Sequence, residues 1–160
     1  GAADEIRELT GAPVIGPHKD DQWLMDDIKQ QWAKYGVTDG PRNVVPDRYL
    51  NDGDELTLGG ETFGVVHTPG HTPGHQVVLI DSNGQKGAVV GDLLHTIAQV
   101  SEPSWCAGVD YDKSQSAASR EKLLDQAEKE GWIIAAGHFP PGKQVGKVVR
   151  EGDKRRWQPL

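Results

Sequence analysis

The sequence predicts one domain of the α/β or α+β class over residues 1–160, and three observations favour this fold class. Two pairs of apolar segments are each joined by a short glycine-containing turn sequence, which is typical of β-hairpins. Two further segments repeat apolar residues at helical spacing. A short apolar run in the last third of the chain is typical of a buried strand. The hairpins lie at 55–66 and 76–90, the helices at 20–35 and 114–129, and the buried strand at 132–136.

The part of the chain before the hairpins is expected to form helices and loops. Residues 1–9 favour a short helix that ends at Gly11, followed by a brief strand around Val14 and Ile15. The segment 20–35 favours a helix with acidic residues at its N-terminal end, and we expect its apolar side chains to lie in the core. These side chains are Leu24, Ile28, Trp32 and Tyr35.

The part of the chain after residue 50 is expected to alternate strands with one long helix. The strands of the first hairpin flank Gly59-Gly60, a dipeptide that fits the twist of paired strands. The helix at 114–129 is expected to end at Gly131. Its inward-facing residues are Ala117, Leu123, Leu124 and Ala127. Two short strands are expected at 147–150 and 155–158.

Composition and charge exclude some classes of partner. The chain is 36% hydrophobic and 26% charged, as in ordinary globular proteins, and its net charge of −7 disfavours binding to nucleic acid. Because no apolar run approaches the ~18 to 20 residues that span a bilayer, and no signal-peptide pattern is present, we expect no membrane partner and a cytoplasmic location. The single cysteine, Cys106, can form no internal disulfide. The short basic run 154–156 is expected to be solvated.

The segment 67–75 holds the densest group of candidate metal-binding residues in the sequence. It reads His67-Thr68-Pro69-Gly70-His71-Thr72-Pro73-Gly74-His75, so that two Pro-Gly pairs set three of the six histidines in one stiff loop. Neutral imidazole is the commonest protein ligand for zinc and related metals. Any one of these histidines could equally be a hydrogen-bonding group of the loop, so a metal site depends on what else converges there.

Three predicted strands are followed by a loop that delivers a metal-type ligand. The first hairpin leads to His71, the second to Asp92, and the buried strand to His138. Because the ends of neighbouring strands lie side by side in layered α/β proteins, these side chains can meet around one ion. Two imidazoles and one carboxylate suit zinc, manganese or iron, and the two oxygens of a carboxylate can also bridge two cations.

These motifs resemble the later motifs of the metallo-β-lactamase superfamily, in the same order and on the same strand-end loops. Residues 1 to about 80 are similar to glyoxalase II-like members, through 11–18, 50–54 and the histidine-rich loop. The rest resembles the methyl parathion hydrolase and acyl-homoserine lactonase branch. Its matching segments are 91–95, 98–100, 137–140 and 146–157. The resemblance implies a metallo-β-lactamase-like αββα sandwich.

The resemblance also implies roles for individual residues. His71 would bind a first metal, Asp92 would be shared between two metals and carry the catalytic role, and His138 would bind the second. His95 would border the substrate pocket. The signature His-x-His-x-Asp-His, which supplies the other ligands of the family, does not occur in these 160 residues, so the resemblance implies a fold incomplete at its N-terminus. The other histidines are expected to be loop, strand-end or supporting groups; they are His18, His67 and His75.

Two functions of different classes follow from this resemblance. The first is a metal-dependent hydrolase, in which a metal-activated water attacks an ester, thioester, lactone or phosphotriester bond of a small-molecule substrate. Its cofactor would be one or two zinc ions, with manganese or iron as alternatives. The second is a non-catalytic fold fragment that pairs with another chain supplying the N-terminal half, or forms a homo-oligomer through an exposed sheet edge.

Overall fold

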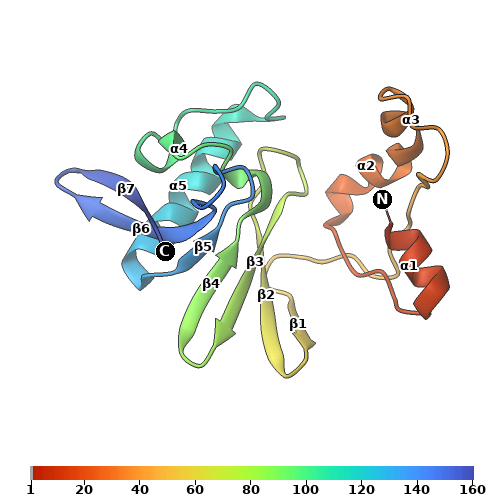
Figure 1. Ribbon diagram of the computed structural model, residues 1–160, viewed down its shortest axis with the longest axis horizontal. Coiled ribbons are helices and arrows are strands. Elements are labelled where there is room, and N and C mark those ends of the chain that lie inside the picture. The colour runs from red at the N-terminus through yellow and green to blue at the C-terminus, as the bar shows by residue number, and fades with distance from the viewer. Residues whose placement is uncertain (1) are drawn as a thin grey trace. The chain divides into compact units, whose positions relative to one another are not determined.

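Residues 2–160 are described by the computed structural model, in which the chain divides into an N-terminal unit up to Leu50 and a C-terminal unit from Asn51 (Figure 1). The N-terminal unit contains helices and loops, whereas the C-terminal unit contains a sheet with its helices. The single domain expected over residues 1–160 stays a prediction. No helix within residues 2–160 combines the length and the apolar character that crossing a membrane requires.

The N-terminal unit begins with the predicted helix. This helix ends at Gly11, whose φ of 71° is the left-handed conformation that closes many helices. The prediction of a brief strand around Val14 and Ile15 is wrong, because Ile15 forms only an isolated bridge with Arg48. The helical elements of this unit are α1 (Ala3–Thr10), η1 (Lys19–Asp21), α2 (Gln22–Asp26) and α3 (Ile28–Ala33).

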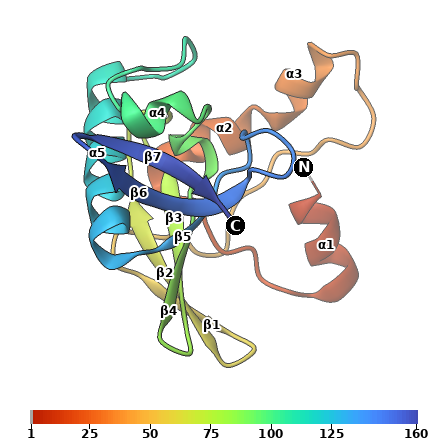
Figure 2. The ribbon, with the colours of Figure 1, turned by 60° about the vertical axis from the view of Figure 1, so that its left-hand side comes forward.

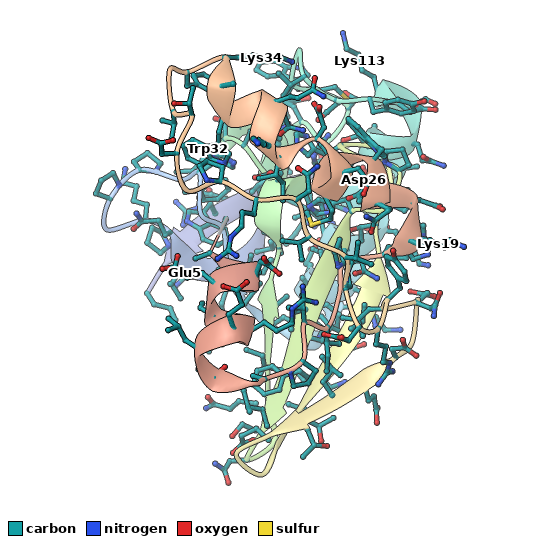
Figure 3. All side chains as sticks on the ribbon, turned by 90° about the vertical axis from the view of Figure 1, so that its right-hand side faces the viewer. Glu5, Lys19, Asp26, Trp32, Lys34 and Lys113 are labelled. Carbon is teal, nitrogen blue, oxygen red and sulfur yellow. The ribbon has the colours of Figure 1, made fainter. Side chains whose placement is uncertain are left out.

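The helix expected at 20–35 is broken at Asp27, between α2 and α3. At the break the side chain of Asn43 accepts a hydrogen bond from the backbone N–H of Lys29 at 3.1 Å and donates one to the carbonyl of Asp26. Figure 3 shows Asp26 on α2 and Trp32 on α3. The expected core position of the aromatic side chains is also wrong, since Trp32 is 46% exposed and Tyr35 is 82% exposed.

The C-terminal unit is built on one seven-stranded sheet in which the strands lie side by side in chain order. All neighbouring strands are antiparallel except β4 and β5, which are parallel. The strands are β1 (Glu55–Leu58), β2 (Glu61–His67), β3 (Gln76–Ser82), β4 (Gln85–Val89), β5 (Ile133–Ala135), β6 (Val145–Glu151) and β7 (Lys154–Pro159). This mixed sheet with its helices confirms the predicted α/β class.

Both predicted hairpins are confirmed, and their turns follow from local chemistry. Gly59 and Gly60 have φ angles of 62° and 89°, and Asn83 and Gly84 have φ angles of 52° and 75°. Two successive residues with positive φ form the turn that matches the right-handed twist of paired strands, and glycine and asparagine adopt this conformation most readily.

One long helix covers the sheet. The side chain of Asp112 accepts the backbone N–H of Gln115 at 3.0 Å and so caps the start of this helix, which ends at Gly131. Figure 2 shows the helix running along one side of the sheet, and it packs against β6. The helices of this unit are η2 (Gly91–Leu93), α4 (Ala98–Ser101) and α5 (Lys113–Glu130).

The inner face of α5 carries both apolar and polar residues. Leu123, Leu124 and Ala127 are buried in the core, as predicted, and Ala117 is half-buried. Ser116 and Arg120 are also fully buried on this helix, which the apolar pattern does not indicate. The buried side of the helix therefore combines core packing with a polar cluster.

The basic run at the C-terminal end is only partly solvated. Lys154 and Arg156 are exposed as expected, whereas Arg155 is 9% exposed. The guanidinium of Arg155 makes ion pairs with three acidic side chains of α5, which fasten β7 to this helix. These acidic residues are Glu121, Asp125 and Glu128.

The sheet topology brings three loops to one edge. Because β4 and β5 are parallel neighbours with Val89 opposite Ala135, the chain leaves both strands at the same edge. The strand β3 is antiparallel to β2 and β4, so the loop from β2 to β3 lies at that edge as well. These three loops carry His71, Asp92 and His138.

Candidate metal centre

The histidine-rich loop is braced by its own polar groups. The backbone N–H of Thr68 donates to the carbonyl of His75 at 2.9 Å, and Nε2 of His67 lies 2.8 Å from the carbonyl oxygen of Pro73. The N–H of Gly70 donates to the carbonyl of Thr72 at 3.0 Å. These contacts close the loop on itself and leave His71 at its outer turn.

Gly70 fixes this loop against the start of α5. It has a φ of 136°, and a Cβ atom added there would lie 2.1 Å from the backbone nitrogen of Ser116. The carbonyls of Gly70 and His71 accept the N–H groups of Asp112 and Tyr111, at 2.9 and 3.1 Å. Only glycine allows so close an approach, so the position of His71 is set by contact between two backbones.

The three residues predicted to share a site lie together, with Asp92 between the two histidines. One carboxylate oxygen of Asp92, Oδ1, lies 2.5 Å from Nε2 of His138, and the other, Oδ2, lies 3.4 Å from Nε2 of His71. The Asp92 and His138 side chains are 46% and 50% exposed, whereas that of His71 is 16% exposed. The cluster therefore opens to solvent on the side of Asp92 and His138.

The residues around Asp92 favour the ionised form of its carboxyl group. Burial alone raises the pKa of this carboxyl, but the hydrogen bond with His138, followed by the electrostatic effects of His71 and His138, outweighs it and holds the pKa below its ordinary value. An ionised carboxylate presents lone pairs on both oxygens.

His71 is held from behind by a carboxylate that the sequence analysis missed. Its Nδ1 lies 3.0 Å from Oδ1 of Asp110, whose side chain is fully buried. The contact of Nδ1 with Asp110 is a hydrogen bond and is shorter than the 3.4 Å between Nε2 and Oδ2 of Asp92, so in the neutral ring Nδ1 carries the proton and Nε2 keeps a lone pair. This is the tautomer in which Nε2 can bind a metal.

Asp110 belongs to a buried polar group that we call the Asp110 cluster, which consists of Asp110, Ser116 and Arg120. The hydroxyl of Ser116 donates to Oδ2 of Asp110 at 3.0 Å, and Nη2 of Arg120 lies 3.7 Å from the same oxygen. Burial alone raises the pKa of the Asp110 carboxyl, but the hydrogen bonds from His71 and Ser116, followed by the charge of Arg120, hold it below its ordinary value. A serine and an arginine on the face of a helix that carries Leu124 and Ala127 would have been the available signal.

His95 lies between the two metal-type histidines. Its ring is stacked on that of His138 with centroids 4.8 Å apart, and its centroid lies 5.0 Å from that of His71. Burial, followed by the electrostatic effects of His71 and His138, lowers its pKa, which favours the neutral imidazole. Its Nδ1 is a buried nitrogen with no hydrogen-bond partner among residues 2–160.

The segment that follows Asp92 is held by a buried amide. The side-chain oxygen of Gln99 accepts the backbone N–H of His95 at 2.7 Å, and its nitrogen donates to the carbonyl of Trp105 at 2.9 Å. Of the aromatics near the site, Phe139 is buried against Trp157 with ring centroids 4.9 Å apart, whereas Trp105 is 59% exposed. Phe139 therefore belongs to the core, and Trp105 lies on the surface.

The remaining histidines have supporting positions. His75 accepts the backbone N–H of Asp92 at Nε2, 3.1 Å away, and so connects the histidine-rich loop to the loop after β4. His67 is the last residue of β2, as expected. His18 lies in the N-terminal unit, where its Nδ1 accepts the N–H of Asp20 at 3.2 Å.

The donor chemistry of this cluster fits a metal ion. Around Asp92, two groups of three residues have ligand atoms that all lie within 4.8 Å of one another, and both of these groups include His95. Imidazole nitrogens and carboxylate oxygens at such separations suit zinc, manganese or iron, and the buried Nδ1 of His95 makes no hydrogen bond within residues 2–160 that would compete with metal binding. The groups are Asp92, His95 and His138, and His71, His95 and Asp110, although both oxygens of Asp110 already accept hydrogen bonds within the fold.

Comparison with known proteins places the chain in a family. The family model described as the metallo-beta-lactamase superfamily matches residues 1–138. The chain is 30% identical over 161 residues to the hydroxyacylglutathione hydrolase GloC of Haemophilus influenzae, with 100% of this chain and 69% of the relative covered.

Solved structures also match the fold. The hydrolase AbOPH of the beta-lactamase superfamily is 29% identical, with a TM-score of 0.62, and the match covers 71% of this chain and 38% of that protein. The dizinc quorum-quenching lactonase AidC is 28% identical, with a TM-score of 0.61, over 70% of this chain and 37% of that protein. TTHA1623 in a di-iron-bound form is 26% identical, with a TM-score of 0.62, over 88% of this chain and 64% of that protein.

These matches confirm the family that the motifs predicted and the fold class of the sheet and helices. The chain spans little more than a third of the length of AbOPH and AidC, so it corresponds to part of those proteins. With its ligand-type residues gathered at one edge of the sheet and a family match over 1–138, this chain belongs to the metallo-β-lactamase superfamily.

Proposed function

We propose that this chain is a metal-dependent hydrolase whose metal centre includes His71, Asp92 and His138. The observation that carries the proposal is the position of Asp92, whose two oxygens face two different imidazoles at 2.5 and 3.4 Å. A carboxylate between two histidines can bind one cation or bridge two. One or two zinc ions are the proposed cofactor, with manganese or iron as alternatives, and the names of the dizinc AidC and the di-iron TTHA1623 support this range.

A bound cation of this kind would polarise a carbonyl or phosphoryl oxygen and would lower the pKa of a water molecule from about 15.7 towards ~7. The residues of the chain supply the geometry for this chemistry. His71 and His138 offer imidazole nitrogens, and Asp92 offers an ionised carboxylate that can also accept a hydrogen bond from the attacking water and orient it. Asp92 is therefore the proposed catalytic residue.

The proposed substrate is a small molecule with an ester, thioester, lactone or phosphotriester bond. GloC is named a hydroxyacylglutathione hydrolase and AidC a lactonase, which supports an acyl bond as the reacting group. We assign a substrate-facing role to His95, since its neutral ring lies against both His71 and His138. From there it can donate or accept one hydrogen bond.

Metal content tests this function first. Protein purified without chelator and then supplied with zinc, manganese or iron is expected to retain at least one equivalent of metal by elemental analysis. Metal-loaded protein is then expected to hydrolyse a member of a panel that contains an acylglutathione thioester, an acyl-homoserine lactone, an aryl ester and an aryl phosphotriester. If the protein retains less than a tenth of an equivalent of each of the three metals, the proposal is wrong.

Two variants with the same chemical change, one in the proposed site and one on the surface, test the role of Asp92. Asp92→Asn removes the charge between the two imidazoles, so both metal retention and hydrolysis are expected to be lost. Asp81→Asn makes the same change at an exposed position on β3 and is expected to leave both unchanged. Equal activity in the two variants would contradict the assignment of Asp92.

The non-catalytic alternative has a distinct outcome. A fold fragment that pairs with another chain, or with a second copy of itself, is expected to give a stable oligomer that binds no metal and hydrolyses none of the substrates. Size-exclusion chromatography with light scattering, combined with the metal analysis, distinguishes this outcome from a metal-loaded active protein.

A further inference from the structure

A fully buried arginine lies behind the metal centre. Arg120 of α5 has no exposed surface, and its guanidinium donates to backbone carbonyls on the segment that follows Asp92. Its Nε donates to the carbonyl of Leu93 at 2.9 Å, and its Nη1 donates to that of Pro103 at 2.6 Å. Because a buried charge is costly unless it is paired and hydrogen-bonded, these contacts fix the position of the guanidinium.

The same guanidinium reaches the other side of the site through the Asp110 cluster. Nη2 of Arg120 donates to Oγ of Ser116 at 3.0 Å, and the hydroxyl of Ser116 donates to Oδ2 of Asp110 at 3.0 Å. The backbone N–H of Ala107 donates to this same oxygen at 3.1 Å, which leaves Oδ1 directed at Nδ1 of His71, 3.0 Å away. Every oxygen of the Asp110 carboxylate is thus committed.

The orientation of His71 follows from this arrangement. Two donors occupy Oδ2, so Oδ1 is the oxygen that remains for His71, and its 3.0 Å contact with Nδ1 is shorter than the 3.4 Å contact between Nε2 and Asp92. The neutral ring therefore carries its proton on Nδ1 and keeps the lone pair of Nε2 on the side of Asp92. Carboxylates that hold metal-binding histidines in this way fix their tautomer and raise their basicity, and removing one weakens metal binding by about 10- to 100-fold.

We propose that Asp110 is a positioning residue that sets the Nδ1–H tautomer of His71, and that Ser116 and Arg120 hold Asp110 for this purpose. Arg120 also fixes Leu93, the neighbour of Asp92, so one buried guanidinium sets the spacing between two proposed metal ligands. The effect on metal binding rests on the proposed function, whereas the tautomer does not.

Asp110→Asn tests the proposal sharply because an amide has only one acceptor oxygen. The fixed N–H of Ala107 requires that oxygen on the Oδ2 side, so the amide nitrogen faces His71. An N–H group directed at Nδ1 of His71 favours the tautomer protonated at Nε2, which cannot bind a metal through that nitrogen. The variant therefore keeps the size of the side chain and reverses the hydrogen bond.

The tautomer is measured directly by ¹⁵N NMR of the histidine ring nitrogens in metal-free protein at pH 8. In the unmodified chain, Nδ1 of His71 is expected to carry the proton, and in Asp110→Asn the proton is expected to move to Nε2. A merely structural role for Asp110 would not move this signal. If Nε2 of His71 carries the proton in the unmodified chain, the proposal is overturned, whatever the variants do.

Zinc affinity, measured by competition with a chromophoric chelator, is the second readout. Asp110→Asn is expected to weaken zinc binding by at least about tenfold. Asp112→Asn is the matched control, since this nearby carboxylate caps α5 and does not contact His71, and it is expected to leave zinc binding unchanged. Unchanged tautomer and affinity in Asp110→Asn would overturn the proposal.

A milder variant covers the case in which Asp110→Asn does not fold. Ser116→Ala removes one donor to Oδ2 and is expected to weaken zinc binding by about threefold, as for the loss of one hydrogen bond, with a smaller shift of the His71 ring signals in the same direction. No shift of these signals in folded Ser116→Ala would overturn the role of Ser116 and Arg120. A chain that shows the expected tautomers but binds no metal would overturn the proposed function and leave this inference intact.

Discussion

The imidazole of His75 accepts the backbone N–H of Asp92 at Nε2, 3.1 Å away, while its Nδ1 lies 2.8 Å from the hydroxyl of Thr68. An Nε2 that accepts a hydrogen bond carries no proton, so Nδ1 carries it and donates to Thr68. His75 is therefore a brace between the histidine-rich loop and the loop that presents Asp92. Its role is structural support of the site, as the sequence analysis expected.

His75→Ala is expected to loosen Asp92 without removing any proposed metal ligand. The N–H of Asp92 loses its acceptor, which destabilises the fold by about 1–3 kcal/mol and weakens zinc binding. Urea unfolding and chelator competition measure the two effects. His67→Ala, which removes a contact to Pro73 and none to Asp92, is the control, and equal zinc affinity in the two variants would contradict the brace.

Gly70→Ala is expected to displace the histidine-rich loop from α5. The added methyl group would lie 2.1 Å from the nitrogen of Ser116 and 2.2 Å from its Cα, and the backbone of neither segment can move aside without breaking the hydrogen bonds that join them. We expect a destabilisation of at least about 2–3 kcal/mol, measured by thermal or urea unfolding. Gly84→Ala also replaces a glycine with positive φ but meets no atom within 4 Å, and a loss of stability as large as that of Gly70→Ala would contradict the steric explanation.

Metal removal is expected to destabilise the C-terminal unit. A ligand that binds only the folded state adds about 2.7 kcal/mol when its free concentration is a hundred times its Kd, so zinc should raise the unfolding temperature and a chelator should reverse the rise. Differential scanning calorimetry with and without zinc measures the shift. Asp92→Asn should show no shift, and an equal shift in both proteins would indicate binding elsewhere.

Glu130 is expected to titrate well below an ordinary glutamate. Its pKa is lowered to about 2 by hydrogen bonds from Lys86, then Trp132 and Gln126. Because the folded-state pKa is depressed, the stabilisation is present above the unfolded value of 4.5 and is lost as the pH falls through about 2. NMR titration of the carboxyl carbon is expected to show a higher pKa in Lys86→Met and no change in Lys113→Met, whose lysine lies at the start of α5. The same pKa in both variants would contradict the contribution of Lys86.

Elements that depend on neighbouring residues were predictable from the sequence. Both hairpins follow from the turn residues, and the end of α5 follows from Gly131, because φ preferences act within one or two residues. The break at Asp27 was not predictable from the helix itself, since the side chain of Asn43, far along the chain, provides its hydrogen bonds.

The polar residues behind the site were missed because their burial depends on partners distant in sequence. From the sequence, Arg120 would be expected on the surface of a helix. In the structure it is buried, because the carbonyls of Leu93 and Pro103 accept hydrogen bonds from its guanidinium. From the sequence, Asp110 would be expected to be an exposed loop carboxylate. In the structure Ser116 and His71 donate hydrogen bonds to it, which allows its burial. The sequence shows that these side chains are charged, and burying a charge is unfavourable. It does not show the hydrogen bonds that offset this unfavourable free energy.

The sequence by itself determined the metal-type side chains and the strand-end loops that carry them. Only the tertiary structure decided that β4 and β5 pair in parallel, which brings Asp92 and His138, 46 positions apart in the chain, within 2.5 Å of each other. It also decided which nitrogen of His71 faces Asp92, through a carboxylate 39 positions away. The physical reason is that turn and helix preferences are local, whereas strand pairing and buried hydrogen bonds depend on the free energy of packing the whole unit.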